Sequence, residues 1–196
     1  VEQEAQIRLM EKLKNHKGHN SMLVLRPADA KETTEAWALA MANTATPTAL
    51  ILSRQNITDL PEGNDYSQAA KGAYIVAGSD ENADVILVAS GSEVSTLVAG
   101  AELLRKDGVK CRIVSVPSEG LFRSQCACYQ EEVLPAGVKK FGLTAGLPVN
   151  LQGLVPAHEG KVWGLESFGF SAPYKVLDEK LGFTAENVYN QVKAML

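Results

Sequence analysis

The sequence has few of the residues that mark membrane, disulfide-rich or nucleic-acid-binding proteins. No apolar run in its 196 residues approaches the roughly 20 residues that span a bilayer, so we expect no transmembrane helix and no membrane partner. Only three cysteines occur, an odd and sparse set that suggests a reducing compartment. Positive charge is not in excess. The net charge of −4 argues against nucleic acid as a partner.

A secretory signal is also missing. Residues 1–20 are polar and carry charges of both signs, so we expect a cytoplasmic protein. The sequence opens at Val1 inside a helical pattern, which suggests a segment of a longer protein. Hydrophobic residues make up 45% and charged residues 21%, as in a soluble globular protein. The length allows one domain, or a small domain with a piece of another.

Two helices are predicted near the amino terminus. The first covers residues 2–14 and has Ala5, Leu9 and Leu13 on one stripe. The second follows Asp29 and Glu32, which have the spacing of a capping box: Asp29 accepts from first-turn amides while Glu32 reaches back to the cap. One face of this helix carries Thr33, Ala36, Trp37, Ala40 and Met41.

Two short apolar runs, residues 22–25 and 49–52, flank the second helix and fit buried strands. The crossover between them predicts a parallel pair. Residues 53–72 are rich in Asn, Asp, Gly, Pro and Ser and lack apolar periodicity, so we interpret them as an inter-domain linker. The predicted architecture is α/β in two pieces: an incomplete unit up to about residue 60, and a complete domain from about residue 73 to 196.

The second piece again predicts strand, helix and strand. Residues 85–89 form a buried strand, a helix starts near Glu93, and residues 110–116 return as a strand. The core face of this helix consists of Val94, Leu97, Ala101 and Leu104, with Gly108 just past its end. From 121 to 160 the periodicity weakens into loops and short strands, with a helix predicted around 124–132.

Two helices are predicted at the carboxy terminus. Ser171 caps the first, which has Pro173 in its first turn and ends at Gly182. Its inward face carries Tyr174, Leu177 and Leu181. Thr184 caps the second, and its buried stripe consists of Val188, Val192 and Met195.

Several polar motifs are candidates for chemistry, but each has a simpler structural interpretation. The turn Ser90-Gly91-Ser92-Glu93 leads into a helix and has the form of an anion site, yet a plain capped turn explains it better. His16 and His19 have a zinc-compatible spacing but lie in a solvated loop without Cys or acidic partners. Cys126 and Cys128 lack a second ligand pair, and His158 lacks a Ser/His/Asp arrangement.

Arg54 is the strongest candidate binding residue. It follows the predicted strand 49–52, and open α/β sheets place ligand crevices at the carboxyl ends of their strands. A guanidinium there can hold a phosphate through two hydrogen bonds. The alternative is a surface arginine paired with Asp59 or Glu62.

Four stretches, taken in order, resemble transketolase. They are residues 25–30 (LRPADA), 47–56 (PTALILSRQN), 85–94 (VILVASGSEV) and 168–173 (FGFSAP) with 182–184 (GFT). The Ser-Arg-Gln-Asn stretch is the most specific of them. Residues 114–118 and 129–135 are similar to the family's carboxy-terminal domain, and the resemblance is weakest across 143–161.

The resemblance implies an α/β fold in which residues 1–60 are part of a pyrimidine-binding domain, 61–72 a linker, and 73–196 a carboxy-terminal domain of three layers around a mostly parallel sheet. It implies an enzyme that transfers a two-carbon ketol unit between sugar phosphates in the pentose phosphate pathway. Thiamine diphosphate and a divalent metal, Mg or Ca, are held between the subunits of a homodimer. Arg54 matches the family's arginine that grips the substrate phosphate.

Parts of the family pattern are missing. The Gly-Asp-Gly and Asn-Asn signature, the substrate-channel histidines and the cofactor-activating glutamate do not occur. In the family they precede the position of Val1. The isolated chain is therefore predicted to be inactive, with no catalytic, cofactor-binding or metal residue and no bound cofactor. The family often has an acidic residue where residues 143–146 stand, and the aromatic-rich stretch that follows is replaced here.

Two other hypotheses remain open at this point. One is the carboxy-terminal segment of a 1-deoxyxylulose-5-phosphate synthase or a dehydrogenase E1β subunit, which share this fold. The other is a standalone ligand-binding or dimerisation domain. The stretches at 53–56 and 168–173 favour transketolase.

Overall fold

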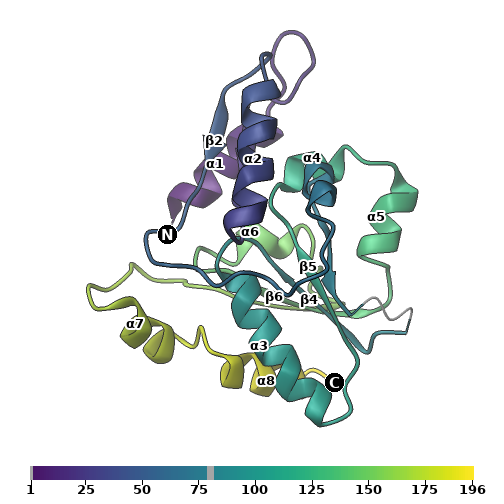
Figure 1. Cartoon of the computed structure of the whole chain (residues 1–196), viewed down its shortest axis with the longest axis vertical. Helices are drawn as coiled ribbons and strands as arrows, with labels where there is room; N and C mark the ends of the chain where they lie inside the picture. Colours follow the sequence, from purple (N-terminus) through teal and green to yellow (C-terminus); the bar gives the residue numbers. More distant parts are fainter. Residues whose placement is uncertain (1, 79–81) are drawn as a thin grey trace.

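The computed structural model describes residues 2–78 and 82–196 as two α/β parts joined by a connecting segment (Figure 1). Val1 lies outside the described residues. The helices are α1 (Glu2–Lys12), α2 (Ala30–Ala42), the 3-10 helix η1 (Tyr66–Lys71), α3 (Glu93–Lys106), α4 (Glu119–Arg123), α5 (Ala127–Val133), α6 (Val149–Gln152), α7 (Tyr174–Leu181) and α8 (Ala185–Lys193). The strands are β1 (Leu23–Leu25), β2 (Thr48–Leu50), β3 (Tyr74–Ala77), β4 (Val85–Ala89), β5 (Cys111–Ser115), β6 (Lys139–Leu143) and β7 (Gly160–Trp163).

The larger part is a three-layer domain around a five-stranded sheet. The strand order is β3-β5-β4-β6-β7, and only the β3–β5 pair is antiparallel. The register of β3 shifts between Ile75 and Ala77, at the edge of the sheet. Figure 1 shows α3 and α8 together on one side of the sheet, and α4 and α5 on the other. The predicted α/β class with a mostly parallel sheet is confirmed.

Strand β4 lies between β5 and β6. Its side chains contribute to two hydrophobic cores, one on each face of the sheet. Val85, Leu87 and Ala89 pack with α3 and α8, whereas Ile86 and Val88 pack with α4, α5 and α6. All five side chains are fully buried. A strand buried on both faces needs no polar alternation, which is why its sequence is a continuous apolar run.

Helices α3 and α8 meet where α3 carries Gly100. A Cβ atom built on Gly100 would lie 2.6 Å from Cγ1 and 2.7 Å from Cβ of Val188. Val188 is fully buried, and its Cβ is not the free end of a flexible side chain. Gly100 therefore allows the close approach of the two helices.

We predict that Gly100→Ala destabilises the chain although alanine favours helix. Overpacking costs about 1–3 kcal/mol, and the gain in helix propensity is about 0.5–1 kcal/mol. The net loss in urea unfolding should be about 0.5–2 kcal/mol. In a Val188→Ala background the same substitution should become neutral or stabilising, because the clash is removed. An equal effect in both backgrounds would contradict this account of the contact.

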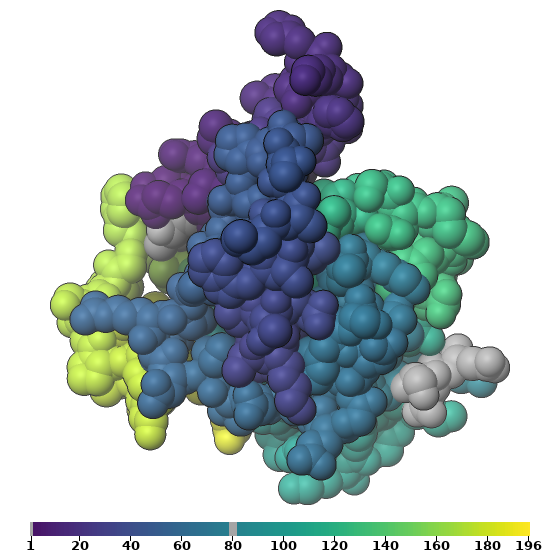
Figure 2. Space-filling view, turned by 45° about the horizontal axis from the view of Figure 1, so that its top comes forward, coloured from purple at the N-terminus to yellow at the C-terminus, as the bar shows by residue number. Residues whose placement is uncertain are grey.

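The smaller part is the amino-terminal segment, residues 2–60, drawn in purple and blue in Figures 1 and 2. β1 and β2 pair in parallel, with Leu25 opposite Leu50, as predicted for this crossover. Helix α2 is capped as expected: Asp29 Oδ1 accepts from the amide of Glu32 at 2.8 Å. The Glu32 side chain reaches back to the amide of Ala28, one residue before the cap.

The large apolar side chains on the stripes of this segment are exposed, and the small Ala36 of the α2 stripe is buried. Leu9 and Leu13 of the first stripe are 62% and 63% exposed, and Met41 on α2 is 77% exposed. The buried side chains of α1 are instead Arg8 and Glu11. The periodicity located the helix correctly, but the charged face of α1 is the one that contacts the larger part.

Two carboxylates hold the amino-terminal segment against the larger part, and a third joins it to the connecting segment. Glu32 Oε1 accepts from Tyr74 at 2.8 Å and from the Ser115 hydroxyl at 2.6 Å. Glu11 Oε2 accepts from the amide of Gly120 at 3.1 Å. Asp29 Oδ2 accepts from Tyr66 of η1 at 2.8 Å. Burial raises the pKa of Glu32 and of Glu11, although hydrogen bonds to both carboxylates act in the opposite direction.

The raised pKa of Glu32 predicts a pH-dependent stability. Below about pH 4.5, its ordinary pKa, the carboxyl is protonated in both states. Above that, the unfolded chain loses the proton while the folded chain still holds it, so the stability falls until the raised folded pKa is passed. The free energy of unfolding of the wild type minus that of Glu32→Gln should therefore decrease as pH rises from about 4.5. Parallel pH profiles for the two proteins would contradict this.

The connecting segment, residues 61–72, packs on both parts. It contains η1, and Ala69 is buried there. At the other end of the chain, α7 starts after Pro173 without a side-chain cap, so Ser171 does not cap it. None of its residues is buried, contrary to the inward face predicted for Tyr174. Gly182 ends α7 with a φ of 80°, and Thr184 caps α8, as predicted.

Helices long and apolar enough to cross a membrane do not occur among the described residues.

Cys126 and Cys128 are joined by a disulfide, which was not predicted from the sequence.

Candidate functional site

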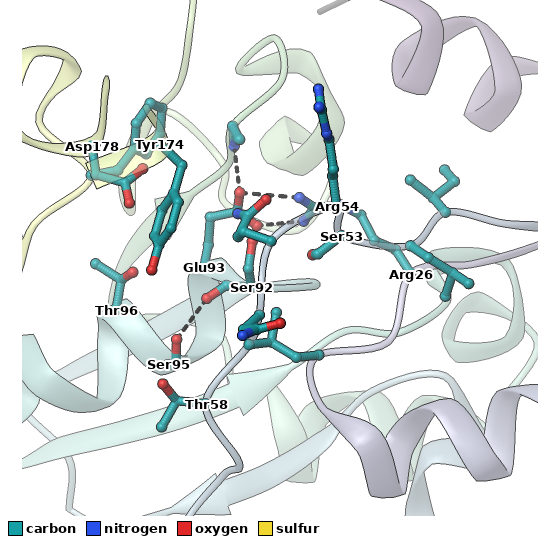
Figure 3. Close-up of a pocket in the computed structure, with 17 residues that line it drawn as sticks. Arg26, Ser53, Arg54, Thr58, Ser92, Glu93, Ser95, Thr96, Tyr174 and Asp178 are labelled. Carbon is teal, nitrogen blue, oxygen red and sulfur yellow. Dashed lines mark hydrogen bonds and ion pairs between the residues drawn. The ribbon is translucent and has the colours of Figure 1, made fainter. Parts of the chain in front are cut away.

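A polar cavity of about 380 Å³ lies where the two parts meet (Figure 3). One wall is the chain after β2, residues 51–58, and the other comes from α3 and α7. Figure 3 shows Ser53 and Arg54 on one side of the cavity, facing Thr96, Tyr174 and Asp178 on the other. Because β1 and β2 are parallel, the residues that follow them emerge at the same edge. The cavity is therefore at the carboxyl ends of these strands.

An ion pair between Arg26 and Glu93 forms the inner wall of the cavity. The guanidinium meets the carboxylate at 2.5 Å and 3.0 Å, and Nη1 also donates to the carbonyl of Ser90. The Arg26 side chain is only 10% exposed and that of Glu93 5%. Burial acts to lower the pKa of Arg26, but the charge and hydrogen bonds of Glu93, together with the charge of Glu4, outweigh it, so the pKa is raised. This pair joins the residue that follows β1 to the first residue of α3.

Gly91 makes the ion pair possible. It has a φ of +66°, and a Cβ atom there would lie 2.6 Å from Cζ of Arg26. Its amide also donates to the carbonyl of Arg26 at 3.1 Å. The Ser-Gly-Ser-Glu turn therefore has a structural role. The Ser90 hydroxyl of this turn accepts a hydrogen bond from the guanidinium of Arg8 at 3.1 Å.

Arg54 lies at the mouth of the cavity and is exposed. Within the part of the chain that the structure describes, its guanidinium forms no ion pair or hydrogen bond, so the alternative pairing with Asp59 or Glu62 is not formed. Arg54 also lines a neighbouring cavity of about 670 Å³, with Phe170 and Tyr174. A cation without a partner between two cavities is available for an anionic ligand.

Hydroxyl groups line the side of the cavity opposite Arg54. Ser95, Thr96 and Tyr174 lie there, and the Ser95 hydroxyl donates to the carbonyl of Ser92 at 2.8 Å. Burial, followed by the nearby charge of Glu93, raises the pKa of Asp178. Tyr174 and Asp178 are four residues apart on one face of α7. This group was not predicted from the sequence, because the spacing of Tyr174 with Leu177 and Leu181 was interpreted as a core face. The signal in the sequence was the four-residue spacing of Tyr174 and Asp178, which puts two polar groups on one face of a helix.

The other candidate residues are not brought together. His16 and His19 remain in the loop after α1, and His158 is 80% exposed with Glu159 at 3.8 Å. In residues 2–78 and 82–196, no group of three His, Cys, Asp or Glu side chains could hold a metal ion. The carboxylate nearest the inner wall, Glu93, already accepts from Arg26 and from the amide of Ala145. The donor set present here does not fit a divalent metal bound to a diphosphate.

Comparison with known proteins identifies the family. A family model described as the transketolase-like carboxy-terminal domain matches residues 72–184. The chain belongs to the transketolase family. A probable transketolase from Streptococcus pneumoniae is 43% identical over 171 residues, which is 87% of this chain and 26% of that protein. Transketolase from Staphylococcus aureus is 42% identical over 178 residues, covering 89% of this chain and 27% of the relative.

The fold agrees with this membership. The structure of transketolase from Leishmania mexicana superposes with a TM-score of 0.85 at 36% identity, covering 97% of this chain and 26% of that one. This chain is thus a transketolase fragment that spans about a quarter of the length of the relatives it matches. The predicted membership of the transketolase family is confirmed.

Proposed function

We propose that this chain contributes part of the substrate site of a transketolase that transfers a two-carbon ketol unit between sugar phosphates. The observation that carries the proposal is the unpartnered guanidinium of Arg54 at the mouth of a hydroxyl-lined cavity. A phosphate offers oxygens that match the planar fork of arginine, and hydroxyl groups suit the polyol chain of a sugar. The related proteins are named as transketolases. The same proposal places the enzyme in the pentose phosphate pathway and in the cytoplasm.

Arg54→Ala in the complete enzyme tests this role. A charge-assisted contact to phosphate contributes about 1.5–3 kcal/mol, so kcat/KM for phosphorylated sugars should fall on the order of 10- to 150-fold. Most of the loss should be in KM if the contact is equally strong in the ground and transition states. Arg54→Lys should recover only part, because a point charge lacks the planar fork. The melting temperature should hardly change, since the side chain is exposed.

The matched control for Arg54→Ala is an unphosphorylated sugar. Its turnover should be nearly unaffected, because it lacks the group that Arg54 binds. An equal loss on free and phosphorylated sugars, or a large drop in melting temperature, would support a structural role instead.

The proposed enzyme uses thiamine diphosphate and a divalent metal, Mg or Ca, held by parts of the protein other than this chain. When bound, this cofactor supplies the carbanion chemistry. The support is that no group of three His, Cys, Asp or Glu side chains among the described residues could hold a metal ion. The role proposed for this chain is to bind and orient the sugar phosphate.

Calorimetric titration of this chain with thiamine diphosphate and Mg²⁺ tests the cofactor assignment. We expect no binding above background, because the chain lacks ligands for the diphosphate and its metal. Stoichiometric micromolar binding would show that a cofactor site lies within these 196 residues.

The proposed partners are the remainder of the enzyme and a second subunit in a homodimer. The exposed apolar side chains of the amino-terminal segment support this, because monomers rarely leave such groups in water. They are Leu9 and Met10 of α1, Leu13 just after it, and Trp37 and Met41 of α2.

We also propose the domain boundaries: residues 1–60 as part of a pyrimidine-binding domain, 61–72 as a linker, and 73–196 as the carboxy-terminal domain. The start of the matched family model at residue 72 supports this division. Limited proteolysis should cut first in residues 53–72, where many side chains are exposed. The two pieces should then elute together in gel filtration, since the buried carboxylates still join them. Early cleavage within 85–116 would contradict these boundaries.

A further inference from the structure

The cysteine pair Cys126 and Cys128 lies apart from the cavity, at the start of α5, where Cys126 is the N-cap and Cys128 is in the first turn. The two sulfurs form a disulfide that spans a single residue, Ala127. Both cysteines are exposed, whereas Cys111, the third cysteine, is buried. The sulfurs of the pair are thus open to attack by dissolved thiols.

This disulfide has little to contribute to stability. A cross-link stabilises a fold mainly by restricting the unfolded chain, and the effect grows with the length of the closed loop. A loop with one residue between the cysteines restricts very little. Exposed disulfides are also the ones that are readily reduced, in contrast to buried structural ones. Its position therefore favours exchange chemistry over a structural function.

One sulfur is the better leaving group. The amide of Tyr129 donates to Sγ of Cys126 at 3.4 Å. Such a bond strengthens when the acceptor becomes a thiolate, since hydrogen bonds to charged groups are stronger. An incoming thiolate should therefore attack Sγ of Cys128 and release Cys126.

We propose that Cys126 and Cys128 are a redox-active pair that exchanges with low-molecular-weight thiols and their disulfides. In reduction, a small thiolate attacks Cys128, the Cys126–Cys128 bond breaks, and a mixed disulfide forms while Cys126 takes up a proton. A second small thiolate then attacks the small-molecule sulfur of the mixed disulfide and releases Cys128. The products are two protein thiols and one small disulfide, a transfer of two electrons. Oxidation is the reverse, with the small disulfide as oxidant.

The test equilibrates the folded chain with mixtures of reduced glutathione and glutathione disulfide, and then traps free thiols with a maleimide. Mass spectrometry should show a shift of two maleimide groups that follows the ratio of the two glutathione forms. Cys111 is an internal reference: it is buried and should be labelled only after denaturation. Non-reducing electrophoresis should show a monomer throughout, because the bond is within one chain.

Matched cysteine variants test whether the mass shift of two maleimide groups comes from Cys126 and Cys128. Cys111→Ser should keep the two-group shift, and Cys126→Ser or Cys128→Ser should abolish it. Circular dichroism should show that each variant is folded, as expected at exposed positions. Two results would overturn the proposal. One is two labelled thiols at every glutathione ratio; the other is a disulfide that resists excess reduced glutathione until the chain is denatured.

Discussion

The buried carboxylates between the amino-terminal segment and the sheet are the constraint on which the rest of this structure depends. The segment has only two paired strands, and much of its apolar surface is in water, so it has little core of its own. Glu11 and Glu32 instead accept hydrogen bonds from the larger part. Hydrogen bonds need defined distances and angles, whereas apolar contact does not. These carboxylates therefore fix the orientation of the segment as well as hold it.

The cavity follows from that orientation. Arg26 at the end of β1 reaches Glu93 at the start of α3 only when the segment is held in this position. The chain after β2 then lies opposite α7, which places Arg54 across from Tyr174 and Asp178. In the proposed function, one part of the chain supplies the cation and the other supplies the hydroxyl groups. The carboxy-terminal domain would then have a part in shaping the site.

The sequence predicted those features whose determinants are close together in the chain. β4 was predicted with its observed bounds because an apolar run between turn residues is a local signal. The capping of α2 by Asp29 depends on a residue three positions away, so it too was visible. Arg54 was identified from its place after a strand, and the structure puts it at the cavity, although its role remains a proposal.

What the sequence did not predict depends on residues far apart. The two hydroxyl donors to Glu32 are 42 and 83 positions away, and one donor to Glu11 is 109 positions away. Nothing in α1 shows that Arg8 and Glu11 face the protein, because exposed and buried charges look alike in a helical pattern. The prediction of a buried face on α7 was wrong for a related reason. Its spacing fits either a core face or a cavity wall, and only the neighbouring chain decides between them.

The register shift in β3 has a consequence for assembly. β3 is the antiparallel edge of the sheet, and its pairing with β5 is interrupted between Ile75 and Ala77. An interrupted edge offers no straight row of amides and carbonyls to a passing strand, so another chain cannot readily extend the sheet there. In the proposed assembly, the irregular edge would leave side-chain packing, which selects for shape, as the means by which a neighbouring subunit attaches.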